Sequence, residues 1–331
     1  MSSSLPLVKP GYLNVPTKPD APISYSFFPA TSSSATLSHD TLIVFINGLG
    51  LQAASWIPAV ASLQSYLLGA CPALLTYDRF GQGLTTARDP LDGQKGKELG
   101  HDLLDVANDL HEIILAIAAS KFGLPRTAVE NGKLHLLLVG ASIGAPIARL
   151  YVQSHQEIVS GLIFLDSNIA NVNYSDFLPD PDSPGFDKNA LHLDDCTLEE
   201  YREARTKLCR MFDLKVKNPE SLDRSNSPSL LPYSNKPKLM GTGHSGPSLS
   251  VVGHDPETFA ELSYEMMETP RSLSRITNGY WAKYNEDLTQ ITDEGKSKGV
   301  VIARGCGHFI QKDDPEFVAK QISSMVKELE W

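Results

Sequence analysis

Cysteine is scarce in this sequence, and its distribution excludes two kinds of stabilising site. The cysteines form neither a CxxC pair nor a Cys/His cluster with the spacing of metal ligands, although there are four of them: Cys71, Cys196, Cys209 and Cys306. Neither a disulfide framework nor a metal site is therefore expected, and a reducing compartment is the simpler interpretation.

Long hydrophobic runs are also missing. Nowhere do about eighteen apolar residues follow one another, so no membrane-spanning helix is expected. Residues 1–20 contain no apolar segment behind a basic start, which a secretory signal would require. The sequence thus favours a cytoplasmic protein without a membrane partner.

Basic residues are outnumbered, with 29 Lys and Arg against 39 Asp and Glu, which gives a net charge of −10. Because such a charge repels phosphate backbones, nucleic acid is not an expected partner. No internal repeat is present, and nothing in the sequence indicates an oligomeric state. A chain of 331 residues suffices for one large domain, or for a domain with a lid.

Short apolar runs bounded by turn residues recur along the chain, and several precede long amphipathic patterns. This alternation is typical of an α/β fold in which helices flank a mostly parallel sheet. Eight strands are expected, of which the first two would be an antiparallel start: 12–15, 23–28, 42–46, 73–77, 134–139, 162–165, 249–252 and 300–303.

Helical periodicity predicts helices over 103–119 and 315–329. Asp314 can cap the second helix, and Pro315 suits its first position because the missing N–H is not needed there. Residues 171–246 are rich in Pro, Asp, Ser and Asn, with short helical pieces such as 197–212. We expect this stretch to be an inserted lid, or cap domain, on a core formed by 1–170 and 247–331.

One serine stands among small residues at the end of a predicted strand. The segment Gly140-Ala141-Ser142-Ile143-Gly144 fits the pattern G-x-S-x-G, which has a physical meaning where a buried strand turns tightly into a helix. Neighbours without a Cβ allow the backbone to pack closely around such a turn. The free N–H groups of the following helix would stabilise negative charge that develops at Ser142.

With this motif, the chain resembles the α/β-hydrolase superfamily over nearly all of its length outside the lid. Three further segments match the family in order: Asn47-Gly48-Leu49-Gly50, Tyr77-Asp78-Arg79-Phe80-Gly81-Gln82-Gly83-Leu84-Thr85 and Gly305-Cys306-Gly307-His308-Phe309. The resemblance implies an oxyanion hole formed by the N–H groups of Leu49 and Ile143. Asn47 replaces the histidine that is common in the family. Asp78 and Arg79 are expected to hydrogen-bond or pair locally and to support the fold.

His308 is the expected general base, because flanking glycines let its loop carry an imidazole over the serine. His254, near the end of another strand, is the competing candidate. Position within the family pattern favours His308.

Two aspartates at strand ends could orient this base. Asp166 is preferred because it follows Ser142 by 24 residues, whereas Asp255 precedes His308 by 53 residues, an interval longer than the family pattern. A subgroup of haloalkane dehalogenases and fungal lactonases similar to zearalenone hydrolase place the acid, a glutamate, at a position like that of Asp166. Asp255 remains the alternative.

The resemblance implies a serine hydrolase, a carboxylesterase or lactonase, that cleaves a small or medium lipophilic ester or lactone without a metal or other cofactor. Substrate contacts are expected from Gly48, Phe177, Phe212 and Trp281. Two alternatives stay open: carbon–carbon bond hydrolysis, a lyase step or cyclisation in a small-molecule pathway, and a receptor-like module that binds a ligand with little turnover.

Overall fold

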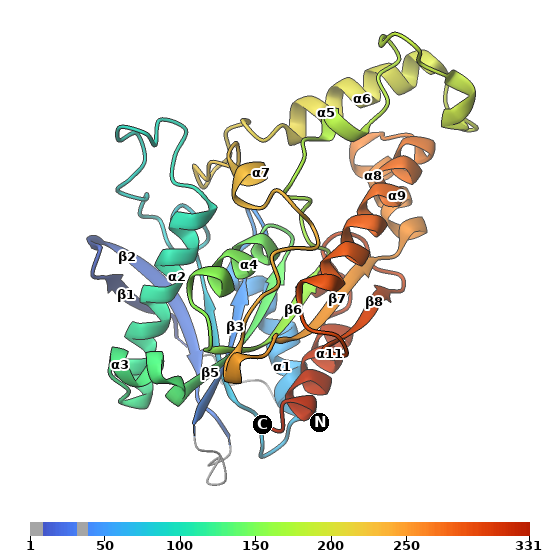
Figure 1. The fold of residues 1–331 in the computed structure, drawn as a ribbon. Coiled ribbons are helices and arrows are strands. Elements are labelled where there is room, and N and C mark those ends of the chain that lie inside the picture. The colour runs from blue at the N-terminus through green and yellow to red at the C-terminus, as the bar shows by residue number, and fades with distance from the viewer. Residues whose placement is uncertain (1–8, 32–38) are drawn as a thin grey trace.

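An eight-stranded sheet runs through the computed structural model, which describes residues 9–31 and 39–331 (Figure 1). Residues 1–8, part of the stretch in which no signal segment was expected, lie outside the described residues. The strands are β1 (Gly11–Val15), β2 (Lys18–Phe28), β3 (Asp40–Ile46), β4 (Ala73–Tyr77), β5 (Leu134–Ala141), β6 (Val159–Leu165), β7 (Ser248–His254) and β8 (Ser297–Ala303).

The sheet order is β1-β2-β4-β3-β5-β6-β7-β8. The pairs β1–β2 and β2–β4 are antiparallel, and every other neighbouring pair is parallel. All residues of β4 and β6 are buried, as expected of central parallel strands that helices cover on both faces. The predicted α/β class with a mostly parallel eight-stranded sheet is confirmed.

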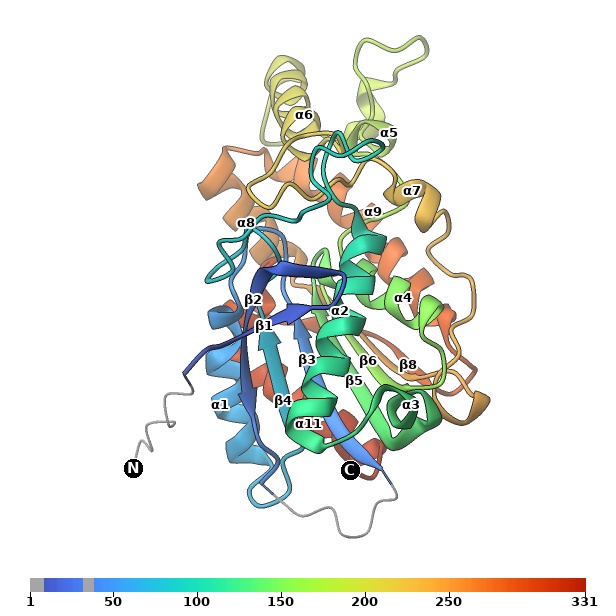
Figure 2. The ribbon, with the colours of Figure 1, turned by 90° about the vertical axis from the view of Figure 1, so that its left-hand side faces the viewer.

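The helices are α1 (Ile57–Tyr66), α2 (Leu103–Ile117), α3 (Arg126–Ala128), α4 (Gly144–Ser154), α5 (Tyr174–Phe177), α6 (Leu198–Phe212), α7 (Ser227–Leu230), α8 (Pro256–Met267), α9 (Arg271–Leu288), α10 (Ile310–Asp313) and α11 (Pro315–Glu328). Figure 2 shows α1 on one side of the sheet and α2 and α4 on the other. Two apolar clusters follow this division, one beneath α1 and α11 and one beneath α2, α4 and α9.

Capping side chains stand at the starts of α2 and α11. Asp102 and Asp105 form a capping box at the start of α2, and the side chain of Asp314 accepts a hydrogen bond from the N–H of Phe317 in α11. The first helix was predicted over 103–119 and ends at Ile117, where the chain continues into a π-helical turn.

Residues 171–246 contain α5, α6 and α7, and α6 projects beyond the sheet at the upper end of Figure 1. They form a small apolar cluster of their own, in which Leu178, Leu191, Tyr201 and Leu208 pack with Leu273 of α9. The division into a core and an inserted lid stays a prediction. Within the described ranges, no helix combines the length and the hydropathy that crossing a bilayer requires.

Candidate active site

The candidate residues follow strands that end at the same edge of the sheet. Because β3, β5, β6, β7 and β8 run parallel, the loops after them meet at this edge, where ligands bind in open α/β sheets. These loops carry, in order, Asn47 to Gly50, Ser142, Asp166, Asp255 and His308.

Ser142 occupies a tight turn between β5 and α4, and its φ of 53° lies in the left-handed region. Its N–H donates to the carbonyl oxygen of Leu165 in β6 at 3.0 Å. A Cβ on Gly140 would lie 2.5 Å from the carbonyl oxygen of Gly144, and one on Gly144 would collide with the carbonyl oxygen of Ile46. The glycines of the motif are therefore required by close backbone packing.

The imidazole of His308 lies between Ser142 and Asp166. Its Nε2 is 2.9 Å from Oγ of Ser142, and its Nδ1 is 2.6 Å from Oδ2 of Asp166. Three residues named from the sequence are thus in direct contact, although 166 residues separate His308 from Ser142.

Asp255 has a different set of contacts. Its carboxylate accepts hydrogen bonds from the N–H groups of Glu257 and Thr258, which begin α8, and of Gly305. Its own N–H donates to the carbonyl oxygen of Cys306 at 2.8 Å. Asp255 therefore shapes the loop that carries His308, and the long interval between them is filled by α8 and α9.

The carboxylate of Asp166 is fully buried and contacts two histidines. Burial alone would raise the pKa of Asp166, but the rings of His254 and His308 outweigh it and hold the pKa of this carboxyl below its ordinary value. His254 approaches with Nδ1 at 2.8 Å from Oδ1 and 2.9 Å from Oδ2.

Both ring nitrogens of His254 face acceptors. Nε2 lies 3.0 Å from Oδ1 of Asn278, whose amide nitrogen donates to the carbonyl oxygen of Pro256. Both nitrogens therefore act as donors, which requires the imidazolium form. Burial opposes this charge, but Asp166 overcomes that effect, and the pKa of His254 is raised above its ordinary value.

His254 was the competing base in the sequence, and the structure places its ring against Asp166, on the carboxylate that His308 also contacts. Sequence reasoning did not identify Asn278, which completes the surroundings of His254 from the middle of α9. A polar residue inside an amphipathic helix gives no signal of such a contact.

The loop after β3 passes close to Ser142. A Cβ on Gly48 would lie 3.4 Å from the Cβ of Ser142. The side chain of Asn47 holds this loop, because its Nδ2 donates to the carbonyl oxygen of Tyr77 and its Oδ1 accepts from Trp56. In the hydrogen bonds found within the described part of the chain, the N–H groups of Leu49 and Ile143 are not donors.

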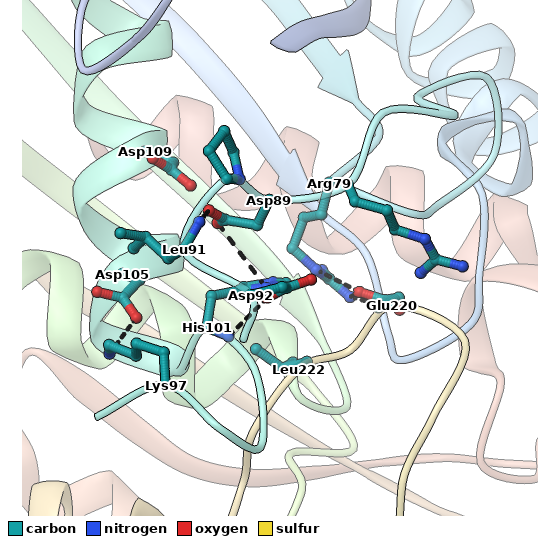
Figure 3. Close-up of polar contacts among 12 residues, drawn as sticks. Arg79, Asp89, Leu91, Asp92, Lys97, His101, Asp105, Asp109, Glu220 and Leu222 are labelled. Carbon is teal, nitrogen blue, oxygen red and sulfur yellow. Dashed lines mark hydrogen bonds and ion pairs between the residues drawn. The ribbon is translucent and has the colours of Figure 1, made fainter. Parts of the chain in front are cut away.

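Arg79 meets the expectation of local contacts only in part. Asp78 does bond locally, to the N–H of Leu84 at 2.9 Å. The N–H of Arg79 also donates locally, to Oε1 of Gln82 at 3.2 Å, but its side chain forms a buried ion pair with Glu220, 141 residues further along the chain, at 2.8 Å (Figure 3). Glu220 belongs to the segment predicted as a lid, and no local pattern could have indicated this pair.

The aromatic residues proposed to bind substrate lie at different places. The ring of Trp281 is 5.3 Å from that of His308, and its Nε1 donates to the carbonyl oxygen of Ser167. Phe212 stacks on Tyr174 at 4.9 Å, and Phe177 contacts Tyr174 at 5.1 Å. Phe177 and Phe212 thus form one aromatic row through Tyr174.

The fold agrees with the comparison to known families. Residues 43–321 match the model of the alpha/beta hydrolase family, and the chain belongs to this family. A search of the curated proteins found no significant match.

Solved structures with the same fold include esterases and lipases. A thermophilic esterase from Thermogutta terrifontis is 15% identical with a TM-score of 0.51, over 98% of this chain and 100% of that chain. The peroxisomal alpha-beta-hydrolase Lpx1 from Saccharomyces cerevisiae is 14% identical with a TM-score of 0.52, over 100% and 88% of the two chains. A soluble variant of monoglyceride lipase from Saccharomyces cerevisiae is 13% identical with a TM-score of 0.52, over 99% and 96%. At these identities the likeness shows the fold alone.

The raised pKa of His254 predicts a pH-dependent stability. Its charged form contributes stability that is fully present below the unfolded pKa, about 6.5, and is lost as the pH rises through the folded pKa. His254→Gln should therefore lower the free energy of unfolding more at about pH 6 than at about pH 9. Urea unfolding at both values measures this.

The matched control is His244→Gln, because the side chain of His244 is 76% exposed. This change should have little effect on the free energy of unfolding at either pH. Equal destabilisation by His254→Gln at both pH values would contradict the assignment of a buried imidazolium.

Proposed function

We propose that this protein is a serine hydrolase, a carboxylesterase or lactonase, that cleaves a small or medium lipophilic ester or lactone through an acyl-enzyme. The observation that carries the proposal is the hydrogen-bonded series from Ser142 through His308 to Asp166, with separations of 2.9 and 2.6 Å. This is the arrangement in which a base activates a serine and a carboxylate orients the base. Membership of the alpha/beta hydrolase family supports it.

In the proposed reaction, Oγ of Ser142 attacks the carbonyl carbon while Nε2 of His308 takes its proton. Nδ1 of His308 then carries the other proton, and the negative charge of Asp166 stabilises the imidazolium. His308 returns its proton to the leaving alkoxide, which departs as an alcohol. Water, deprotonated by the same histidine, attacks the acyl-enzyme. The bond between the acyl carbon and Oγ of Ser142 then breaks, His308 returns the proton to Oγ, and the carboxylic acid is released.

The N–H groups of Leu49 and Ile143 would stabilise the tetrahedral oxyanion. Both amides follow strands that end beside Ser142, and Ile143 directly precedes α4, whose N-terminus favours negative charge. Gly48 would leave room for the substrate at this position, because a side chain here would contact the Cβ of Ser142.

Residues 171–246 would form the lid over the site and would supply an apolar surface to a lipophilic substrate. The row of Phe212, Tyr174 and Phe177 continues to Tyr280 of α9, because the rings of Phe177 and Tyr280 stack at 4.4 Å. Burial, and then the negative charge of Asp166, raise the pKa of Tyr174.

A fluorophosphonate probe followed by peptide mapping tests the nucleophile, and a series of p-nitrophenyl esters and macrocyclic lactones tests the substrate class. The proposal expects labelling of Ser142 together with turnover of at least one of these series. Labelling without any ester or lactone turnover would contradict the esterase assignment and would favour carbon–carbon cleavage or ligand binding.

Ser142→Ala should abolish ester turnover and leave the fold intact, because the glycines rather than the hydroxyl permit the turn. His308→Ala should lose a comparable amount of ester turnover, because Ser142 and His308 act as one unit. The double variant should be no worse than either single variant. Steady-state kinetics check this, and a double variant far below both would show that they are not partners.

Asp166→Asn should lower turnover by orders of magnitude. An amide preserves the size but removes the charge that stabilises imidazolium, and the corresponding change in serine proteases costs about 10⁴-fold in turnover. Asp255→Asn is the matched control, because Asp255 bonds the loop of His308 without contacting the ring. It should change turnover by less than about tenfold.

Both variants must show a native circular dichroism spectrum and a cooperative melt before their rates are compared. The reverse ranking, with Asp255→Asn inactive and Asp166→Asn active, would move the acid to Asp255.

A further inference from the structure

A carboxylate from the proposed lid reaches the loop that carries the Leu49 amide. Glu220 is 1% exposed, and its Oε1 accepts hydrogen bonds from the N–H of Gly50 at 2.6 Å and from Nε2 of Gln82 at 3.0 Å. Its Oε2 accepts from Nε of Arg79 at 2.9 Å (Figure 3). Glu220 therefore contacts the loop directly and through two side chains.

We propose that Glu220 is a positioning residue that orients the Leu49 N–H in the oxyanion hole, so that its carboxylate, supplied by residues 171–246, completes the site. This inference rests on the proposed serine hydrolase function and adds to it the residue, Glu220, that orients one donor of the oxyanion hole, the Leu49 N–H.

The orientation follows from the geometry of one peptide. The carbonyl oxygen of Gly48 accepts from Nη2 of Arg79 at 3.1 Å and from Nε2 of Gln82 at 3.0 Å. The bond between Gly48 and Leu49 is trans, so its carbonyl and its N–H point in opposite directions. Holding the Gly48 carbonyl toward Arg79 and Gln82 therefore directs the Leu49 N–H away from them.

Glu220 bonds the two side chains that donate to this carbonyl, which also accepts from the N–H of Leu51 at 3.3 Å. Arg79 is 3% exposed, and a guanidinium buried without a carboxylate carries a large desolvation penalty. Its planar fork bonds Glu220 on one side and the carbonyl oxygens of Asn47 and Gly48 on the other. Without Glu220, Arg79 would lose its carboxylate partner and the N–H of Gly50 would lose its acceptor, and the loop could rotate.

The backbone of the inserted segment lies directly on the core where Glu220 enters. The N–H of Asp223 donates to the carbonyl oxygen of His101 at 2.7 Å, and Nδ2 of Asn226 donates to Asp102 at 3.0 Å. A Cβ on Gly100 would collide with the carbonyl oxygen of Ser221. Figure 3 shows Leu222 of this segment beside His101. The docked segment thus supplies the carboxylate that bonds Arg79, Gln82 and the N–H of Gly50.

The test compares Glu220→Ala and Glu220→Gln with the wild type on an oxygen ester and on the thionoester of the same acid and alcohol. We expect kcat for the oxygen ester to fall by about 10- to 100-fold with a smaller change in KM, because one oxyanion donor typically contributes about 10²- to 10³-fold. A thiocarbonyl sulfur accepts hydrogen bonds weakly, so the thionoester should lose less. The ratio of kcat for the oxygen ester to kcat for the thionoester should therefore fall. This ratio should fall less in Glu220→Gln, which keeps one oxygen acceptor, than in Glu220→Ala.

Asn226→Ala is the matched control, because it removes a bond between the same segment and the core without touching the loop of Gly48. Its rate ratio should equal that of the wild type. An equal loss on both substrates, or an unchanged kcat in a folded Glu220→Ala, would overturn the inference. If Glu220→Ala does not melt cooperatively, the same comparison on Glu220→Gln decides.

Failure of the proposed function and failure of the positioning role give different results. A wild-type protein without ester turnover or probe labelling would overturn the proposed function. An active wild type with an unchanged rate ratio in both Glu220 variants would overturn only the positioning role.

Discussion

One buried carboxylate connects the ends of the strands around the candidate site. Asp166 follows β6, and it contacts His254 at the end of β7 and His308 in the loop after β8. Through His308 the connection extends to Ser142, which follows β5. A charge with no exposed surface is tolerated only with such partners, so the parallel register of these strands and the arrangement of the side chains depend on each other.

A second buried ion pair joins Arg79 and Glu220. It bonds the loop of Gly48, which passes close to Ser142. In the pair of Asp166 with His254, the carboxylate also bonds the imidazole of His308. In the pair of Arg79 with Glu220, the guanidinium also bonds the carbonyl oxygen of Gly48. Buried ion pairs often add little to stability compared with apolar packing. They hold their geometry strongly, however, because separating the partners would leave an unpaired charge in the interior. Both pairs therefore suit the task of holding loops in place.

The sequence predicted the features that local chemistry determines. The strands, the turn at Ser142, the cap at Asp314 and the position of His308 all follow from periodicity, small residues and flanking glycines. Contacts between distant segments could not be predicted in this way. The pair of Arg79 with Glu220 was not expected, nor was Asn278 expected near the site, because nothing in their own neighbourhoods records a partner on another element.

The central claim is that Ser142 becomes acylated during turnover. Rapid acid quenching of the protein with an excess of its best p-nitrophenyl ester, followed by mass spectrometry of the peptides, measures this directly. The account predicts that the acyl mass appears on the peptide containing Ser142 within the time of one turnover, and that Ser142→Ala shows none. Turnover that proceeds with no acyl group on that peptide at any time, or with the group on another residue, would contradict it.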